Sequence, residues 1–449
     1  MLPTAPAQTL VHGRDRLSGR LPATVGGARA WVITVMLMLL MMINFADKAV
    51  LGLAATSIRE EFGLTAQQYG TISSAFFLLF SVSAVVVGHL ADRFSTKKVL
   101  LVLALIWSVA MLPVIGPAGF LVILLSRVVL GAAEGPAFGV AQHAVHKWFD
   151  DADRSVPTAW LTIATSLGVI VGAPALSWMI DAHGWRSAFL LVAVVGVVWS
   201  AVWLVVGRDG PIDLHATDIS TQRVRPLDRI HVPVRKVLST RTWIGCALSA
   251  FAGYWAVSLL IAWVPAFLTD DLGYSKATSG TLTALPWIVG VIALFAQGFG
   301  TQRLMRSGVS SRWARGVMPG LITLAAGAFT LVSIFAHGNG MTLALLTIGL
   351  GLSGAAFAAG MVACGEIAPV GQRGVVLGTF VAFYSLAGVI APYVAGVLVD
   401  RAGDDPTSGY TATFALTGVI AIVGGLLAIT LVSPERDAAL LTAAAGQSD

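Results

Sequence analysis

Four charged side chains, Asp47, Lys48, Arg127 and Glu134, lie within stretches of the sequence that are otherwise apolar. A charge inside a bilayer costs at least ~2.5–3.5 kcal/mol on insertion scales, so such residues are functional candidates by default. Lysine is a compact cation with three donors, which suits a carboxylate ligand. A buried carboxylate beside a cation can exchange a proton near neutral pH, because burial and the cation act oppositely on its charged form. These residues predict anion binding together with proton exchange.

The spacing of Arg127 and Glu134 indicates that they share a helix face. They are seven positions apart, which is two helical turns or about 10 Å. At that distance the two do not pair simply within one helix, although a buried structural ion pair is the alternative interpretation. Gly131, Gly135 and Gly139 recur every fourth residue and predict the close approach of another helix. Arg127 is expected either to adjust the proton affinity of Glu134 or to help hold an anion.

Asn44 and Lys48 are four positions apart and share a face, whereas Asp47 is offset by about 100°. The alternative is that Asp47 and Lys48 mark the outer end of a helix, where a lysine can reach toward water. The apolar run 49–55 continues beyond them and weakens that alternative. Lys48 is therefore the predicted contact for a substrate carboxylate.

The composition indicates the elements that carry these residues. Of 449 residues, 56% are hydrophobic and 11% are charged, far fewer charges than soluble proteins carry. The apolar blocks are continuous and long enough to cross a bilayer as helices, rather than alternating as barrel strands do. The chain is predicted to be an all-α membrane protein. Its twelve expected helices span 30–56, 70–90, 98–115, 118–146, 157–181, 187–207, 243–268, 279–300, 314–335, 341–366, 374–400 and 410–433.

The basic residues predict the topology of this chain. With the N-terminus inside, only Arg59, Arg186, Lys276 and Arg401 fall in outside loops and two more lie in helices, which leaves 22 of the 28 inside. This bias favours two cytoplasmic termini. The expected organisation is a disordered cytoplasmic leader, a six-helix half, a basic cytoplasmic linker that can also touch anionic lipid, a second six-helix half and a cytoplasmic tail. These occupy residues 1–29, 30–207, 208–242, 243–433 and 434–449.

A weak internal repeat relates the two halves. Gly88–Arg93 follows the second expected helix, and Gly298–Arg303 follows the eighth with the same spacing of glycine, an acid or its amide, and arginine. The fifth and eleventh helices also align, with Asp181 and Asp400 at corresponding ends. A duplicated six-helix unit is predicted to place a substrate site between pseudo-symmetric halves near the middle of the membrane.

These motifs resemble those of a known family. Gly88–Lys98 is similar to the loop motif of the major facilitator superfamily, and Gly298–Arg303 to its degenerate partner. A narrower resemblance, to the anion:cation symporter family of organic-anion transporters, covers nearly the whole chain. It is carried by Asn44–Lys48, Glu61–Leu64, Ser74–Phe77, Arg127–Phe138, Lys147–Phe149, Trp263–Pro265, and Gly388 with Pro392.

The resemblance implies roles for several residues. Asp47 and Glu134 are the implied proton carriers. A cytoplasmic gate or latch is expected from Gly88, Asp92, Arg93, Arg154, Gln302 and Arg303. The expected substrate contacts are Lys48, Arg127, Asn44, Phe45, Phe80, Tyr254, Trp263, Tyr384 and Ser385; for the aromatic residues, ordinary helix packing is the alternative.

The chain also departs from the family pattern. Phe45 and Lys48 stand where the family usually has tyrosine and arginine, and Val381 and Ser385 where it often has asparagine. Because sugar-acid members use such polar groups on substrate hydroxyls, these departures favour a flatter or less hydroxylated acid, such as an aromatic acid, over a sugar acid.

The predicted function is secondary active transport: proton-coupled symport of a small carboxylate, either an aromatic acid or a sugar acid, by alternating access. A proton-driven exporter of drugs or metabolites is the alternative, and a membrane sensor would need an output domain that neither terminal segment can supply. The sequence carries no phosphate-binding loop and no hydrolase or metalloprotease motif, so an enzyme is not expected. Cys246 and Cys364 are expected to be small core residues. No metal or cofactor other than the proton is predicted, and no nucleic-acid partner; the chain is expected to be a monomer among the lipids of a bacterial inner membrane.

Overall fold

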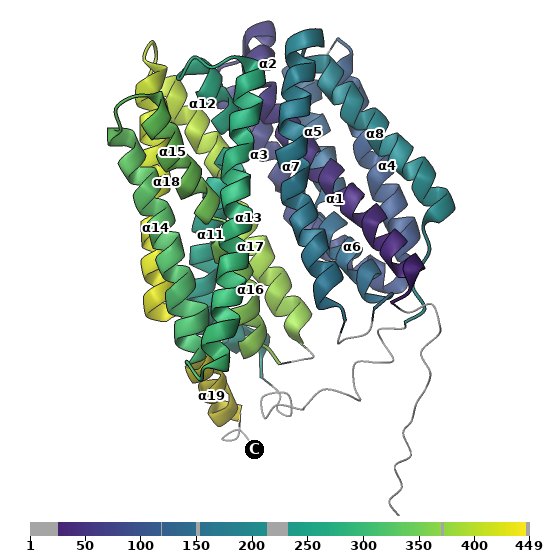
Figure 1. The fold of residues 1–449 in the computed structure, drawn as a ribbon, viewed down its shortest axis with the longest axis vertical. Helices are drawn as coiled ribbons and strands as arrows, with labels where there is room; N and C mark the ends of the chain where they lie inside the picture. Colours follow the sequence, from purple (N-terminus) through teal and green to yellow (C-terminus); the bar gives the residue numbers. More distant parts are fainter. Residues whose placement is uncertain (1–25, 118, 150–152, 213–231, 370–371, 446–449) are drawn as a thin grey trace, which may run out of the picture.

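The computed structural model describes residues 26–117, 119–149, 153–212, 232–369 and 372–445; within these ranges the side chains of residues 85, 88–93, 155 and 444–445 lie outside the description. The described chain is almost entirely helical and forms two bundles side by side (Figure 1). Most of the expected leader and most of the expected linker fall on residues outside the description; the last two residues of the leader, Ala28 and Arg29, already belong to α1.

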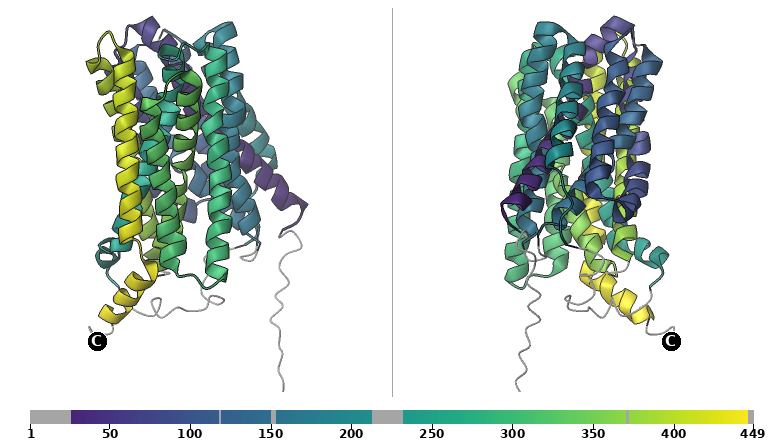
Figure 2. Two further views of the ribbon diagram at one scale, coloured as in Figure 1. Left: turned by 60° about the vertical axis from the view of Figure 1, so that its left-hand side comes forward. Right: turned by 90° about the vertical axis from the view of Figure 1, so that its right-hand side faces the viewer.

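The first bundle holds the N-terminal half of the chain. Most of its long helices run roughly along the long axis of the molecule, whereas α1, in dark purple, is tilted across it (Figure 1 and Figure 2). They are α1 (Ala28–Leu53), α2 (Ala55–Phe62), α3 (Ala66–Arg93), α4 (Thr96–Ile115), α5 (Phe120–Glu134), α6 (Ala137–His146), α7 (Ser155–His183) and α8 (Trp185–Val206).

The second bundle repeats this plan, with two short helices added outside the membrane-crossing segments. Its elements are α10 (Val234–Leu238), α11 (Arg241–Ala262), α12 (Val264–Asp270), α13 (Lys276–Arg306), the π-helix η2 (Arg312–Val317), α14 (Met318–Val332), the 3₁₀ turn η3 (Ser333–Phe335), α15 (Asn339–Leu352), α16 (Ala355–Ile367), α17 (Arg373–Arg401), α18 (Pro406–Leu431) and α19 (Pro434–Ala445). The predicted tail thus contains a helix.

The predicted twelve-helix plan is confirmed. Eleven segments of the described chain are long and apolar enough to cross a membrane, and α3, with 28 residues, is the remaining member of the six-plus-six arrangement. The expected fourth helix, 118–146, is interrupted where Gly135 and Pro136 separate α5 from α6. Proline lacks the backbone N–H that a continuous helix needs, and this explains the break.

Glycines determine how closely helices approach inside the first bundle. A Cβ at Gly131 would lie 1.7 Å from the carbonyl oxygen of Phe76, and one at Gly135 would lie 2.1 Å from that of Phe80, both on α3. Around Gly139 there is open space. The predicted close approach is therefore confirmed at the first two glycines and wrong at the third, because Gly139 belongs to α6, beyond the break.

The two bundles meet at one end. We call the end that holds α2 and α12 the distal end, and the end at which α1 begins and α19 lies the terminal end (Figure 1). Across the interface, α3 packs along α17 and α7 packs along α13. The closest approaches join the distal portions of these helices: a Cβ at Gly70 would lie 2.4 Å from the Pro392 carbonyl oxygen, and one at Gly280 2.0 Å from Ser177 Oγ.

The C-terminal helix α19 is tied to the second bundle by Asp437. This side chain is 3% exposed and accepts a hydrogen bond of 2.7 Å from the backbone N–H of Thr242, at the start of α11. A carboxylate at this position satisfies an unpaired N–H and complements the positive end of the helix dipole. Burial acts to raise the pKa of Asp437, but hydrogen bonds from Arg436 and Thr242 outweigh it and leave the pKa lowered.

We expect Asp437→Ala to reduce stability by about 1 kcal/mol at neutral pH, as loss of a helix cap does. Because the folded-state pKa is lowered, the carboxylate stabilises the fold above its unfolded pKa of ~3.9, and this contribution disappears as the pH falls through the folded value. Thermal unfolding in detergent at pH 7 and in steps down to pH 2.5, below the unfolded pKa, measures the difference. Asp404→Ala, at an exposed acid, is the control; equal losses in both variants would contradict the capping role.

Candidate functional site

Lys48 on α1 is the centre of a buried charged cluster. Its Nζ lies 2.6 Å from Glu134 Oε2 on α5 and donates a hydrogen bond to the Asn44 side-chain oxygen one turn earlier. Lys48 is 8% exposed and Glu134 is 1% exposed. Lys48 therefore points into the bundle, not out along the end of α1. The sequence did not predict this pair, because the two residues lie far apart in the chain.

Asp47 and Arg127 complete the cluster. Both are buried, and Asp47 interacts electrostatically with Glu134, Arg127 and Lys48. Several polar atoms beside the Lys48–Glu134 pair have no hydrogen-bond partner in the part of the chain that the structure describes. They are both carboxylate oxygens of Asp47, the Nε and Nη2 atoms of Arg127 and the amide nitrogen of Asn44. Buried polar groups without partners are costly. Three unpaired donor atoms are thus available to an anion at this cluster.

Aromatic rings surround the ammonium group of Lys48. Its Nζ lies 4.5 Å from the ring centre of Phe45 and 5.7 Å from those of Phe76 and Phe80, within the range of cation–π attraction. Arg127 lies in a similar way over Phe189, at 5.3 Å. Phe45 and Phe80 were predicted at the site, whereas Phe76 and Phe189 were not. Phe76 could have been predicted, because it lies one helical turn before Phe80 and so shares its face of α3.

Two predicted residues of the second bundle reach toward the cluster through Phe77. Tyr254 on α11 packs against Phe77 at 5.8 Å and against Tyr384 on α17 at 5.1 Å. Phe77 in turn contacts Phe80 at 6.0 Å. A continuous series of rings therefore links the environment of Lys48 to the facing half of the protein.

Two other predicted substrate contacts make hydrogen bonds to backbone carbonyls of α17. The Ser385 hydroxyl is buried and donates to the carbonyl of Val381 on its own helix, at 2.8 Å. Trp263 is 1% exposed; its ring nitrogen donates to the Pro392 carbonyl at 3.0 Å, and its ring packs against Tyr69 and Tyr410. The structure thus places Trp263 in the contact between the halves at the distal end and not beside Lys48.

The predicted gate lies at the terminal end and is only partly described. Gly88, Asp92 and Arg93 belong to the last turns of α3, but their side chains lie outside the description. Arg154 donates through Nε to the Phe149 carbonyl at 3.1 Å. Gln302 and Arg303 are exposed near the end of α13. The latch therefore stays a prediction.

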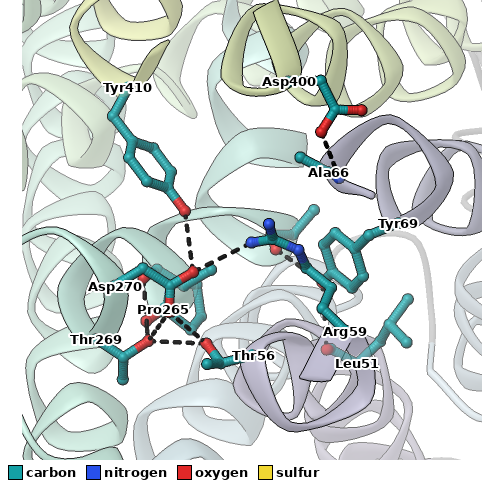
Figure 3. Close-up of polar contacts among 12 residues, drawn as sticks. Leu51, Thr56, Arg59, Ala66, Tyr69, Pro265, Thr269, Asp270, Asp400 and Tyr410 are labelled. Atoms are coloured by element: carbon teal, nitrogen blue, oxygen red, sulfur yellow. Dashed lines mark hydrogen bonds and ion pairs between the residues drawn. The ribbon is translucent and has the colours of Figure 1, made fainter. Parts of the chain in front are cut away.

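Sequence reasoning missed a polar cluster that joins the halves at the distal end (Figure 3). Asp270, the last residue of α12, accepts hydrogen bonds from Thr56 at 2.7 Å and from Arg59 at 3.2 Å, both on α2. The Tyr410 hydroxyl lies 3.5 Å from the same carboxylate. Arg59 was expected in an outside loop, and an acid at the outer end of the opposite half was the available signal for this contact.

Asp400 and Tyr69 make further contacts between the two bundles at the distal end. The carboxylate of Asp400 accepts from the backbone N–H groups of Ala66 and Gln67, at 2.7 and 2.8 Å, and so caps the start of α3 from the other half (Figure 3). The Tyr69 hydroxyl lies within hydrogen-bonding distance of two backbone carbonyls, Ala262 at 2.9 Å and Leu51 at 3.2 Å, and so can bridge the two bundles. These contacts hold the distal ends of the bundles together.

Comparison with known proteins agrees with this architecture. The family model of the Major Facilitator Superfamily matches residues 37–312 and 307–447. A solved bacterial homolog of the human lysosomal transporter Spinster superposes with a TM-score of 0.75 at 16% identity, covering 91% of this chain and 97% of its own. A D-xylose–proton symporter superposes with a TM-score of 0.70 at 16% identity, covering 91% and 99%.

Curated relatives match along most of their length. A hexuronate transporter of Bacillus subtilis is 27% identical over 90% of this chain and 94% of its own. A probable sulfoacetate transporter of Cupriavidus necator is 28% identical over 89% and 94%, and a D-galactonate transporter of Escherichia coli is 24% identical over 88% and 95%. The chain is an integral membrane transporter and not an enzyme, and it belongs to the major facilitator superfamily.

Proposed function

We propose that this protein is a proton-coupled symporter of a small organic anion, which it moves by alternating access. The observation that supports this most strongly is the buried contact of Lys48 with Glu134, with Asp47 and Arg127 as electrostatic neighbours. An ammonium group and an acid held together away from water provide a carboxylate receptor and a proton-binding group at one point of the bundle.

Charge balance provides a route to coupling. The four side chains sum to zero net charge when all are ionised, whereas protonation of one acid leaves a net positive charge that attracts an anion. Because linkage is reciprocal, the bound anion favours protonation by the same free energy. A substrate carboxylate that takes the place of Glu134 at Lys48 leaves that acid buried without a partner, and a proton then removes an expensive charge.

The chemistry of the site favours a small carboxylic acid as substrate. Lys48 and the unpaired donors of Arg127 and Asn44 suit an anionic group. Hexuronate, galactonate and sulfoacetate, named for the relatives, are all small acids. The rings of Phe45, Phe76 and Phe80 beside the cation favour a flat or sparsely hydroxylated member of this class, so an aromatic acid stays a prediction beside the sugar acids.

A ligand panel separates these possibilities. Thermal unfolding of the purified protein would be measured with a hexuronate, D-galactonate, sulfoacetate and benzoate, with D-galactose as an uncharged control and tetraphenylphosphonium as an organic cation. A ligand at 100 times its Kd stabilises the folded state by ≈2.7 kcal/mol. Stabilisation by acids but not by the sugar supports the anion site, and preference for benzoate supports the flatter substrate. Stabilisation by organic cations alone would instead favour a drug exporter.

The proposed orientation places the terminal end in the cytoplasm of a bacterial cell. Positively charged residues favour the inner side of a membrane, and only four were expected in outside loops. Two of these, Arg59 and Lys276, make contacts between the halves at the distal end. The distal end is therefore the proposed outer side. With this orientation, contacts such as Asp270 with Arg59 close the outer side. The structure then corresponds to a state that faces the cytoplasm.

Asp270→Asn is expected to shift this equilibrium toward a state that is open at the distal end. The variant loses the ion pair to Arg59 but keeps a similar volume; a partly exposed pair contributes about 1 kcal/mol or less, which corresponds to a change of up to roughly fivefold in the population ratio. Spin labels at Glu60→Cys and Asp404→Cys, exposed sites at the distal ends of opposite halves, would report a longer distance.

Asp271→Asn provides the matched control. Asp271 carries the same charge as its neighbour but accepts a hydrogen bond from Thr407 within its own half. An unchanged distance distribution in Asp270→Asn, or an equal shift in both variants, would contradict the role of Asp270 in closing the distal end.

A further inference from the structure

A surface groove on the second bundle lies far from the buried charged cluster. It is hollowed between the end of α13, η2, α14 and the end of α15, and it encloses about 370 Å³. Its lining is entirely apolar and consists of Leu304, Val309, Trp313, Val317, Met318, Leu321, Ile322, Ala325 and Leu352. Because Trp313 and Leu321 are 58% and 52% exposed, the groove faces the surroundings of the bundle and not its interior.

The dimensions of the groove suit an acyl chain. It begins beside Leu304, at the terminal end of α13, and follows the second bundle from Trp313 to Ala325. Twelve helical residues rise roughly 18 Å, close to the depth of one leaflet of a bilayer with a ~30 Å core. Trp313 lies at the terminal mouth, and tryptophan is enriched where membrane and water meet.

The terminal mouth of the groove is positively charged. Arg303 and Arg312 immediately precede the lining residues Leu304 and Trp313, and Arg306 lies between them at the end of α13; all three arginines are exposed. The sequence from Gln297 to Met318 contains no aspartate or glutamate.

The acids that approach this corner have other partners. Glu366 pairs with Arg315 and accepts from the Ser311 hydroxyl at 2.6 Å. Glu435 accepts from the Ser311 backbone N–H at 2.5 Å. Both carboxylates are thus engaged by residues other than the three exposed arginines. The terminal mouth of the groove therefore keeps a net positive charge.

The π-helical turn η2 places Arg312 and Trp313 at the mouth of the groove. It starts the ninth membrane-crossing segment at Arg312, and π-helical turns are rare and frequently lie at functional sites. Within this turn Arg312 and Trp313 are exposed while Ala314 is buried and Arg315 is directed to Glu366. One short segment thus presents a cation and an interfacial ring together at the mouth of an apolar groove.

We propose that this groove is a binding site for an anionic phospholipid of the leaflet at the terminal end. One acyl chain occupies the groove from Trp313 to Ala325, and the phosphate and anionic headgroup contact Arg303, Arg306 and Arg312. The charge complementarity of these arginines to an anionic headgroup, above an apolar groove one leaflet deep, distinguishes this occupant from a zwitterionic lipid. The proposal does not depend on the transported substrate.

Native mass spectrometry of the purified full chain in mixed phosphatidylglycerol and phosphatidylcholine tests this proposal. Each basic residue near an anionic lipid surface contributes ≈1 kcal/mol, or about fivefold in affinity. The wild type is expected to retain one phosphatidylglycerol in preference to phosphatidylcholine. Arg306→Gln/Arg312→Gln is expected to lower that preference by roughly 25-fold while a lipid of either kind still binds.

Two further variants separate the site from general attraction. Arg29→Gln/Lys98→Gln removes two exposed cations from the terminal end of the first bundle, outside both the groove and the basic linker, and is expected to leave the preference unchanged. Ala325→Phe fills the groove and is expected to release the retained lipid, with Leu321→Trp as a second groove variant should the first fail to fold. Equal retention of both lipids by the wild type, equal loss of preference in both double variants, or full retention in a folded groove variant would each overturn the proposal.

Discussion

Lys48→Ala is expected to abolish transport of organic acids and to weaken their binding about 13- to 160-fold. A hydrogen bond to a charged group contributes about 1.5–3 kcal/mol, and Lys48 is the buried ammonium at the centre of the cluster, paired with Glu134. The variant also removes the cation that faces Phe45, Phe76 and Phe80. Thermal shift and counterflow in proteoliposomes, with the acid that stabilises the wild type most, measure the two effects.

Loss of the partner charge complicates this variant, because breaking a buried ion pair from one side costs about 3–5 kcal/mol of stability. Lys48→Ala/Glu134→Gln leaves no unpaired carboxylate at the pair and is expected to recover stability without recovering binding. Lys98→Ala, an exposed lysine at the start of α4, is the control for loss of a positive charge. Binding at wild-type affinity in the double variant would exclude Lys48 as the anion contact.

Glu134→Gln is expected to uncouple transport from the proton. Glutamine has nearly the same shape as glutamate and can still accept from Lys48, but it cannot take up a proton. A one-proton symporter can concentrate its substrate about tenfold for each unit of pH difference, which is 1.36 kcal/mol. In proteoliposomes this accumulation should fall to a ratio of about one, while exchange of labelled for unlabelled acid continues.

Glu60→Gln is the matched variant for this comparison, since Glu60 is exposed on α2. It should accumulate substrate as the wild type does. If Glu134→Gln accumulated substrate to the wild-type level, the coupling proton would have to bind elsewhere, and Asp47 would be the next acid to test because its oxygens are buried and without a hydrogen-bond partner in the described structure.

The fold could be predicted from the sequence because a bilayer imposes strong constraints. Long apolar blocks have only one way to satisfy their backbone groups in lipid, and the basic residues orient them. Helix interruptions were not predicted at Trp263 or at Ser353–Gly354, where α11 gives way to α12 and α15 to α16. Apolar composition is the same on both sides of such breaks and gives no signal of them; for the first break the available signal was Pro265, in the first turn of α12.

The charged cluster could be predicted only in part. The cost of charge in lipid singled out Asp47, Lys48, Arg127 and Glu134, and the structure brings them together. The Lys48–Glu134 contact depends on how α1, α3 and α5 pack, and a helix pattern within one segment carries no information about partners on another. Asp270 was missed for the same reason, since its role comes from residues on α2.

The most direct test of coupled symport is to follow substrate and proton together. Proteoliposomes that contain a pH-sensitive dye and no initial pH difference would receive an inward gradient of labelled acid, taken from the members of the panel that do not cross a bilayer unaided: hexuronate, D-galactonate and sulfoacetate. Proton symport predicts acidification of the lumen in step with uptake by the wild type, and none in protein-free liposomes or with Glu134→Gln. Uptake without acidification, or alkalinisation of the lumen as the acid enters, would contradict proton symport through the Lys48–Glu134 site.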